Sequence, residues 1–215
     1  RICVNIPPRH GKSQLVSIYF PAWFLGRNPN KKVMMVSHTT DLAVDFGRKV
    51  RNLIATDEYS SIFPTVRLAS DSKSAGRWNT NSGGEYYACG IGSSIAGRGA
   101  DLLLIDDPHS EQDVINGNFE VFEKAYEWFT FGARTRLMPG GRVAIIQTRW
   151  HMDDLTGRVV RDMGQNERSD QYEVVEFPAI LDMVDEKTKK STQKPLWPEF
   201  FDLEALLRTK ASMPV

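Results

Sequence analysis

The amino-acid sequence predicts a three-layer α/β domain in which helices flank a mostly parallel central sheet. Short apolar runs of strand length alternate along the chain with segments whose apolar residues recur at helical spacing, which is typical of parallel sheets covered on both faces. A chain of 215 residues, 41% of them hydrophobic, can bury one substantial core. We therefore expect one domain over residues 1–215, in which 180–215 form a closing segment.

The apolar runs place the expected strands at residues 2–6, 32–37, 101–107, 142–147 and 172–177. Apolar residues at helical spacing predict helices over residues 14–25, 40–55, 119–137, 153–163 and 202–210. Pro21 is expected to kink or restart the first helix, and Pro139-Gly140-Gly141 to end the third. Thr40 or Asp41 can cap the second helix, and Asp153 the fourth.

The connections are rich in small and polar residues. Residues 77–80 and 85–89 flank an Asn/Ser/Gly turn and predict a β-hairpin, and 90–99 form a small-residue loop. Residues 182–194 are charged and expected to be a loop, and the basic stretch 187–190 within them is expected to be a solvated charge run. Aromatic residues at helical spacing are expected to pack in the core rather than stack on bases: Trp23, Phe24, Phe119, Phe122 and Phe129.

Composition restricts the class of protein. Lys+Arg and Asp+Glu both number 27, so the chain is not basic overall and any contact with DNA must be local. No run approaches the roughly 18 apolar residues of a membrane span, and no signal peptide is visible. Cys3 and Cys89 are expected to be buried free thiols. Arg1 directly precedes an expected core strand, which predicts that the chain is cut from a longer one.

The first strand is followed by Pro-Pro-Arg-His-Gly-Lys-Ser at residues 7–13, and then by a helix. This layout predicts a phosphate-binding loop, because backbone N–H groups and a helix N-terminus together attract anions. Lys12 would reach the β- and γ-phosphates, and the Ser13 hydroxyl would hold Mg²⁺. Only Gly-Lys-Ser matches the Walker A pattern strictly, since Ile6 stands where its first glycine is expected. The alternative is an ordinary surface turn.

The strand at 101–107 ends in two acids, Asp106 and Asp107, after four apolar residues. In P-loop NTPases such a Walker B element uses its first acid to hold Mg²⁺, and its second to position the attacking water. Ligands bind at the carboxyl ends of strands in open α/β sheets, so the location fits. The alternative is that the two aspartates merely terminate the strand in an Asp-Asp-Pro turn.

A third polar strand end follows at Gln147-Thr148, where an amide and a hydroxyl group can sense the γ-phosphate. The alternative for Thr148 is simple solvation of the strand end. Walker A, Walker B and this strand occur in the order expected of a RecA-like, ASCE-type P-loop NTPase, which has an extra strand between the two Walker strands. We expect residues 33–36 to be that strand.

Three motifs together resemble the ATPase domain of the large terminase subunit of tailed bacteriophages. They are Pro-Pro-Arg-His-Gly-Lys-Ser at 7–13, Leu-Leu-Ile-Asp-Asp-Pro at 103–108 and Gln-Thr-Arg-Trp-His-Met-Asp-Asp-Leu-Thr-Gly at 147–157. Residues 196–204 resemble the stretch that closes that domain. The resemblance spans nearly the whole chain, and the third motif makes it specific because generic P-loop ATPases do not carry it.

The resemblance implies a DNA-packaging motor that uses ATP and Mg²⁺ to push double-stranded DNA into a procapsid in the host cytoplasm. It implies a portal protein and a small terminase subunit as partners, and self-association into a ring, with the isolated fragment expected to be monomeric. A nuclease domain would follow Val215, with 180–215 leading towards it, and an adenine-contacting segment would precede Arg1. The alternatives are a helicase-type ATPase of repair or recombination, and a nucleotide-binding module with little hydrolysis.

The resemblance also implies roles for single residues. Nucleotide contacts fall on Pro8, Arg9, His10, Gly11, Lys12, Ser13, Gln14, Gln147 and Thr148, and metal contacts on Ser13 and Asp106. Lys12 is a catalytic residue that neutralises phosphate charge, and Asp107 takes the place of the family's usual catalytic glutamate. Arg98 is the favoured arginine finger, reaching the ATP of a neighbouring subunit, with Arg9 as its rival in cis.

Overall fold

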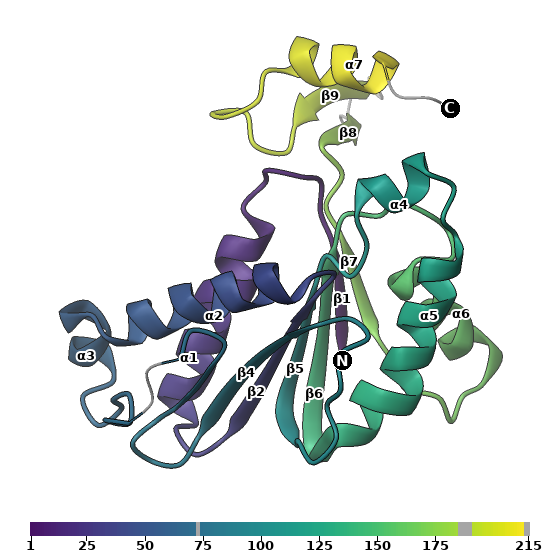
Figure 1. Ribbon diagram of the computed structural model, residues 1–215. Helices are drawn as coiled ribbons and strands as arrows, with labels where there is room; N and C mark the ends of the chain where they lie inside the picture. The colour runs from purple at the N-terminus through teal and green to yellow at the C-terminus, as the bar shows by residue number, and fades with distance from the viewer. Residues whose placement is uncertain (72–73, 185–190, 213–215) are drawn as a thin grey trace.

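The structure is a computed structural model that describes residues 1–71, 74–184 and 191–212. A seven-stranded sheet lies between two layers of helices, as Figure 1 shows. All neighbouring strands in the sheet are parallel except the first two, β3 and β4, which form the expected antiparallel hairpin. The three-layer, mostly parallel α/β prediction is therefore confirmed.

The strands lie in the order β3-β4-β2-β5-β6-β1-β7. Their bounds are β1 Ile2–Asn5, β2 Lys32–Ser37, β3 Arg77–Asn79, β4 Glu85–Gly90, β5 Ala100–Asp106, β6 Leu137–Gln147 and β7 Glu173–Glu176. The strand between β1 and β5, which carry the predicted Walker motifs, is β6, because Ile145 pairs with Cys3 on one side and Ile105 on the other. The expectation that residues 33–36 occupy this place is wrong, since β2 pairs with β5 on its outer side.

Helices cover both faces of the sheet. The described helical elements are η1 Gln14–Tyr19, α1 Phe20–Arg27, α2 Thr40–Ile54, α3 Asp57–Ile62, α4 Glu111–Ile115, α5 Glu120–Glu127, η2 Trp128–Ala133, η3 Arg134–Arg136, α6 Leu155–Gln165 and α7 Leu203–Ser212. Along β2, Val33 and Met35 pack in the core under α1 and α2, whereas Met34 and Val36 pack on the opposite face. A strand buried on both faces explains the continuous apolar runs.

The expected boundary between the third helix and the following strand is wrong. Leu137 already begins β6, and Pro139 and Gly140 lie within that strand rather than at a helix end. The ladder between β5 and β6 shifts register between Ala100 and Leu102. This irregular first part of β6 accommodates a proline and a glycine with a φ of 77°, which an interior strand position would not.

Two helix caps lie next to the predicted residues. The Thr39 side chain, rather than that of Thr40 or Asp41, accepts the Leu42 N–H at the start of α2. Asp154, rather than Asp153, accepts the Gly157 N–H and caps α6. In both cases the capping residue has the extended backbone that precedes a helix. Each capping residue has a polar neighbour that could also cap a helix, so the sequence did not indicate which of the two is the cap.

The closing segment contains a hairpin that the sequence did not predict. β8 (Ile180–Val184) pairs with β9 (Ser191–Pro195) in antiparallel register, and α7 follows them. In Figure 1 this segment lies beyond the edge of the sheet where α4 begins. The mostly exposed side chains of β8 and β9 gave no apolar alternation to detect. The basic stretch 187–190 lies outside the described residues.

Burial confirms part of the predicted core. Cys3 and Cys89 are buried free thiols, and Phe122 and Phe129 are buried. Trp23 and Phe119 are half exposed, so their assignment to the core is wrong. Among the described helices, none is long and apolar enough to cross a membrane.

Candidate nucleotide site

The phosphate loop connects β1 to η1 at the carboxyl edge of the sheet. The loop starts beside β6, since the Ile6 N–H donates to the carbonyl of Gln147 at 3.2 Å. Gly11 has a φ of 78°, and a Cβ there would meet open space, so backbone conformation is what requires glycine. Arg9 has a φ of 61°, uncommon for a side chain of its size. The loop therefore holds two residues in the left-handed region within three positions.

The predicted nucleotide residues of this loop differ in their surroundings. Pro8 and Lys12 line a pocket, and the Arg9 and Gln14 side chains are exposed. His10 faces elsewhere, because its ring stacks on Phe201 of the closing segment with ring centroids 4.6 Å apart. The loop is thus packed against the closing segment.

Lys12 forms an ion pair with the acidic end of β5. Its Nζ lies 2.7 Å from Oδ2 of Asp107, and the lysine side chain is only 10% exposed. The other carboxylate oxygen, Oδ1, accepts the Thr148 N–H at 2.9 Å. The two predicted Walker segments and the end of β6 therefore meet at the Asp107 carboxylate.

The backbone of Asp107 is held in an unusual conformation. Its φ is 43°, and its carbonyl accepts the His38 N–H at 3.2 Å. Its own N–H donates to the carbonyl of Ile146 at 2.8 Å. Strain of this kind is typical of functional sites that the surrounding structure over-determines. The neighbouring ends of β2 and β6 thus hold the Asp107 carboxylate toward Lys12.

Asp106 is buried at the end of β5 beneath the loop. Its Oδ2 accepts a hydrogen bond from Ser17 Oγ at 2.7 Å, whereas Oδ1 has no partner among the described residues. Burial and the nearby Asp107 carboxylate raise the pKa of Asp106 to about 6, against the opposing effect of the Ser17 hydrogen bond, the nearby Ser13 hydroxyl and the charge of Lys12.

These residues fit a magnesium ion. A buried carboxylate oxygen without a partner, next to the Ser13 hydroxyl, offers the hard oxygen ligands that Mg²⁺ prefers. No cluster of three or more acidic, His or Cys side chains suited to a metal exists among the described residues. One carboxylate and one hydroxyl could hold Mg²⁺ if phosphate oxygens and water completed its shell.

Gln147 and Thr148 lie at the end of β6, between the two Walker strands. The Gln147 side chain is buried, and neither its Oε1 nor its Nε2 has a partner among the described residues. Thr148 Oγ1 is 3.4 Å from the carbonyl of Ile6, at the start of the phosphate loop. An unpartnered buried amide beside the loop can bond a ligand that enters there.

A pocket of about 670 Å³ lies beside Lys12, Asp107 and Thr148. It is lined by Pro8, Lys12, His38, Asp107, His109, Ser110, Glu111, Gln112, Thr148 and Trp150. Ser17, His38 and His109 are not among the site residues predicted from the sequence. Ser17 lies one helical turn after Ser13 and His38 follows the end of β2, so helix periodicity and the shared sheet edge could have indicated both.

Arg98 lies away from this pocket, towards the amino edge of the sheet. Its guanidinium lies over the Tyr87 ring at 3.8 Å and contacts Glu85 at 3.3 Å. Glu85 pairs with Lys32 at the start of β2, the end opposite the phosphate loop. Arg98 therefore cannot contact a nucleotide in its own pocket from this position, and the expected role in trans stays a prediction.

The fold and this site define the class of protein as a RecA-like P-loop NTPase domain. The sheet order places one strand between the Walker strands, and the loop, the buried acid and the polar strand end meet at the carboxyl edge.

The chain belongs to the terminase large subunit family. A family model described as "Terminase large subunit, T4likevirus-type, N-terminal" matches residues 3–211. No curated protein matches the sequence. The predicted resemblance is confirmed.

Solved structures of large terminases share the fold. The large terminase of bacteriophage HK97 is similar with a TM-score of 0.51 and 14% identity over 83% of this chain, which spans 35% of the HK97 chain. A mutant form of the ATPase domain of the Thermus phage P74-26 large terminase is similar with a TM-score of 0.57 and 16% identity. This match covers all of the present chain and 84% of the other.

Proposed function

We propose that this chain binds and hydrolyses ATP with Mg²⁺, and that hydrolysis drives double-stranded viral DNA into a procapsid. The observation that carries the proposal is the 2.7 Å ion pair between Lys12 and Asp107, beside the buried pair formed by Asp106 and Ser17. A cation in the phosphate loop, an acid for the metal and an acid for water are the groups that phosphoryl transfer requires. Membership of the terminase large subunit family supports the DNA-packaging role.

Lys12 and Asp107 would exchange partners when nucleotide binds. Phosphate oxygens carry more negative charge than one carboxylate, so the Lys12 ammonium would turn to the β- and γ-phosphates. Asp107 Oδ1 would still accept the Thr148 N–H, and Oδ2 would lose its partner. Oδ2 could then orient and deprotonate a water molecule. Asp107, with its positive-φ backbone, is one of the residues that line the pocket.

The metal would be held by Asp106 Oδ1 and the Ser13 hydroxyl. Bound Mg²⁺ supplies charge that stabilises the β- and γ-phosphate oxygens during transfer. Ser17 fixes the carboxylate by occupying Oδ2, so that Oδ1 is the oxygen left for the ion. Gln147 would bond the γ-phosphate or the water near it, because its buried amide has no partner among the described residues.

The test is ATP turnover by Lys12→Ala and Asp106→Ala variants of the purified protein. Both should lose hydrolysis, by at least about 10²-fold, because each removes a charge that stabilises the transition state. Lys49→Ala and Asp45→Asn are matched controls, because these residues pair with each other on the surface of α2. Normal hydrolysis by either site variant would contradict the site. Nucleotide binding without any turnover by the unmodified protein would favour the non-hydrolysing module.

The family assignment extends the proposal to partners. A portal protein, the small terminase subunit and further copies of this chain in a ring would complete the motor in the host cytoplasm. Residues 180–215, which include the described hairpin β8–β9 and α7, would lead towards a nuclease domain. Arg98 would act on the nucleotide of the next subunit. A sedimentation experiment with and without ATP would test the self-association.

A further inference from the structure

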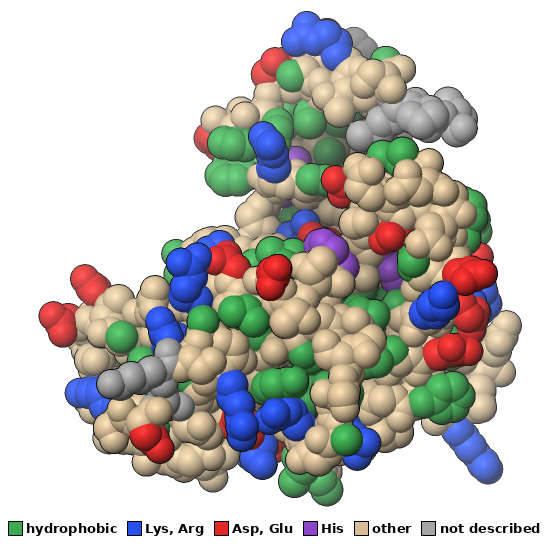
Figure 2. All heavy atoms as spheres, viewed as in Figure 1, with side chains coloured by type: hydrophobic (Ala, Val, Ile, Leu, Met, Phe, Trp, Pro, Cys, Tyr) green, Lys and Arg blue, Asp and Glu red, His purple; other side chains and the backbone are tan. Residues whose placement is uncertain are grey.

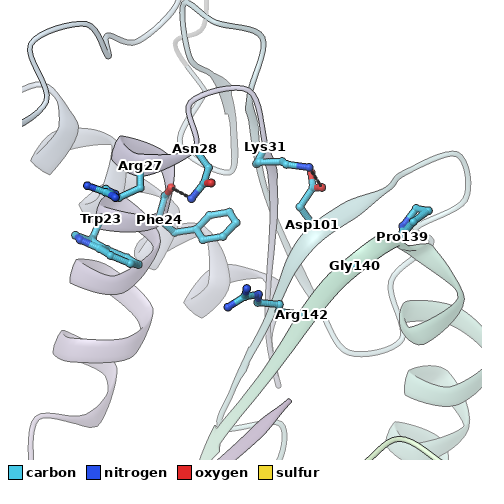
Figure 3. Close-up of a pocket in the computed structure, with 9 residues that line it drawn as sticks. All are labelled: Trp23, Phe24, Arg27, Asn28, Lys31, Asp101, Pro139, Gly140 and Arg142. Carbon is cyan, nitrogen blue, oxygen red and sulfur yellow. Dashed lines mark hydrogen bonds and ion pairs between the residues drawn. The ribbon is translucent and has the colours of Figure 1, made fainter.

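A second pocket lies at the amino edge of the sheet, opposite the phosphate loop. It measures about 440 Å³ and is lined by Trp23, Phe24, Arg27, Asn28, Lys31, Asp101, Pro139, Gly140 and Arg142. The end of α1 forms one wall, and the beginnings of β5 and β6 form the other (Figure 3). Nothing in the proposed nucleotide chemistry uses these residues.

The pocket carries an uncompensated positive charge. Lys31 is paired with Asp101 at 2.8 Å, and the other oxygen of Asp101 accepts the Lys32 N–H at 2.9 Å. Arg27 and Arg142 have no ion-pair or hydrogen-bond partner among the described residues, and both side chains are exposed. In Figure 3 the Arg142 side chain extends from β6 towards α1. Two guanidinium groups are therefore free to bind an anion.

An aromatic wall accompanies these cations. Trp23 is 52% exposed, and Phe24 extends into the space between α1 and β6 (Figure 3). A half-exposed tryptophan beside unpaired arginines provides an apolar surface for the uncharged part of an anionic ligand. The ligand class is thus an anion that carries a sugar, whose C–H face can pack on the indole, or a flat apolar group.

The positive charge continues beyond the pocket along the same edge. Lys32 begins β2, and Arg77 and Arg98 share the single carboxylate of Glu85 at the start of β4. Figure 2 shows Lys and Arg side chains gathered near this lower end of the molecule on the face drawn. The formal net charge of the chain is zero, so this row of cations means that positive charge is concentrated locally at this edge of the sheet. A row suits a polymer with repeated anions better than it suits a single carboxylate.

We propose that this pocket binds the phosphate backbone of duplex DNA, with Arg27 and Arg142 on phosphate oxygens and Trp23 against the sugar. Guanidinium groups bind phosphate oxygens bidentately, and contacts to the backbone position a protein on DNA without reading its sequence. The proposal rests on the proposed function, because it names where the motor contacts its DNA. The contact is then independent of sequence and sensitive to salt.

The experiment compares binding of a fluorescent duplex of about 30 base pairs by anisotropy, over a range of salt, for the unmodified protein and for Arg27→Ala/Arg142→Ala. The double variant should bind about 10- to 100-fold more weakly near 0.1 M salt, and its slope of log K against log[salt] should fall by about 2. Arg168→Ala/Arg208→Ala is the matched control, because it removes two exposed arginines outside the pocket. Binding of an ATP analogue reports on folding.

The outcomes separate the pocket from the proposed function. Unchanged DNA affinity and salt slope in the pocket variant, with DNA binding by the unmodified protein, would overturn the pocket and leave the motor proposal intact. Loss of self-association with normal DNA affinity would assign the pocket to an acidic surface of a second copy, and would also overturn it. No DNA binding by the unmodified protein, at any salt, would count against both proposals.

Discussion

The ammonium group of Lys12 lies 2.7 Å from Oδ2 of Asp107, so an ion pair joins the phosphate loop to the acidic end of β5. Under the proposed function, nucleotide phosphates would replace Asp107 as the partner of Lys12, and this exchange would link the availability of the Asp107 carboxylate to the presence of phosphate.

Asp107→Asn should reduce kcat for ATP hydrolysis by about 10²- to 10⁴-fold, because an amide cannot accept a proton from water. The affinity for nucleotide should stay the same or increase, since Lys12 no longer has a carboxylate to hold it away from the phosphates. Steady-state kinetics and titration with a non-hydrolysable analogue measure the two effects. Asp153→Asn, on an exposed ion pair with Arg161, is the control. Equal losses in binding and turnover would refute the partner exchange.

Ser17→Ala should destabilise the fold by about 1–3 kcal/mol, because it leaves Oδ2 of the buried Asp106 without its hydrogen bond. The same change should raise the pKa of Asp106 further, since that bond lowers it. The Mg²⁺ concentration needed for half-maximal turnover near pH 6 should therefore increase. Urea unfolding and a Mg²⁺ titration test both effects. Ser61→Ala, at an exposed serine of α3, should leave both quantities unchanged.

Acid should destabilise the protein through His109. Burial lowers the pKa of His109 from its ordinary value of 6.5 to about 4, and its Nε2 accepts the Leu155 N–H at 3.1 Å. Between pH 6.5 and pH 4, His109 therefore binds a proton in the unfolded chain but stays neutral in the folded chain. The contribution of neutral His109 to the free energy of unfolding is fully present above pH 6.5. It is lost as the pH falls towards 4, by about 3 kcal/mol in total.

Urea unfolding at several pH values, for the unmodified protein and His109→Gln, isolates this contribution. Asp106 acts in the opposite direction, because its raised pKa favours the folded state at low pH. Since Asp106 is common to both proteins, the difference between their curves reports on His109 alone. Parallel stability curves from about pH 7 to about pH 4 would show that His109 does not cause the loss.

Arg98→Ala should remove turnover that depends on assembly, by about 10³- to 10⁵-fold, and leave nucleotide binding intact. The reason is that Arg98 lies at the edge opposite its own pocket, held by Glu85 and Tyr87. Mixing Arg98→Ala with Lys12→Ala protein should restore some activity, because each supplies what the other lacks. Arg77→Ala, which loses the other partner of Glu85, is the control. A mixture that stays inactive where the unmodified protein assembles would oppose the role in trans.

The sequence predicted the strands of the sheet better than it predicted the boundaries of the elements. Apolar runs such as Leu102–Ile105 are buried on both faces of the sheet, and polar residues of the candidate site follow them. The order of apolar and polar residues along the chain was therefore informative by itself. The order of the strands in the sheet could not be predicted from such local patterns. The pairing of Ile145 with both Cys3 and Ile105 is a contact between distant segments that no local pattern encodes.

Other features depended on contacts that only the folded chain provides. The start of β6 at Leu137 relies on the irregular pairing with Ala100, which overrides the usual effect of Pro139 and Gly140. The Lys12–Asp107 pair joins residues that are 95 positions apart, and the stacking of His10 on Phe201 joins the loop to the closing segment. The roles of the candidate site residues stay predictions from the sequence, whereas the partners of their side chains are set by tertiary contacts.

The helical path that leaves the phosphate loop has a mechanical consequence. η1 and α1 run without a break from Gln14 to Arg27, which at about 1.5 Å per residue is a rod of roughly 20 Å. One end carries the loop that would bind ATP, and the other carries Trp23 and Arg27. A continuous helical path would couple a displacement of the loop to Trp23 and Arg27. The six π-helical residues at its start are the place where its winding can change.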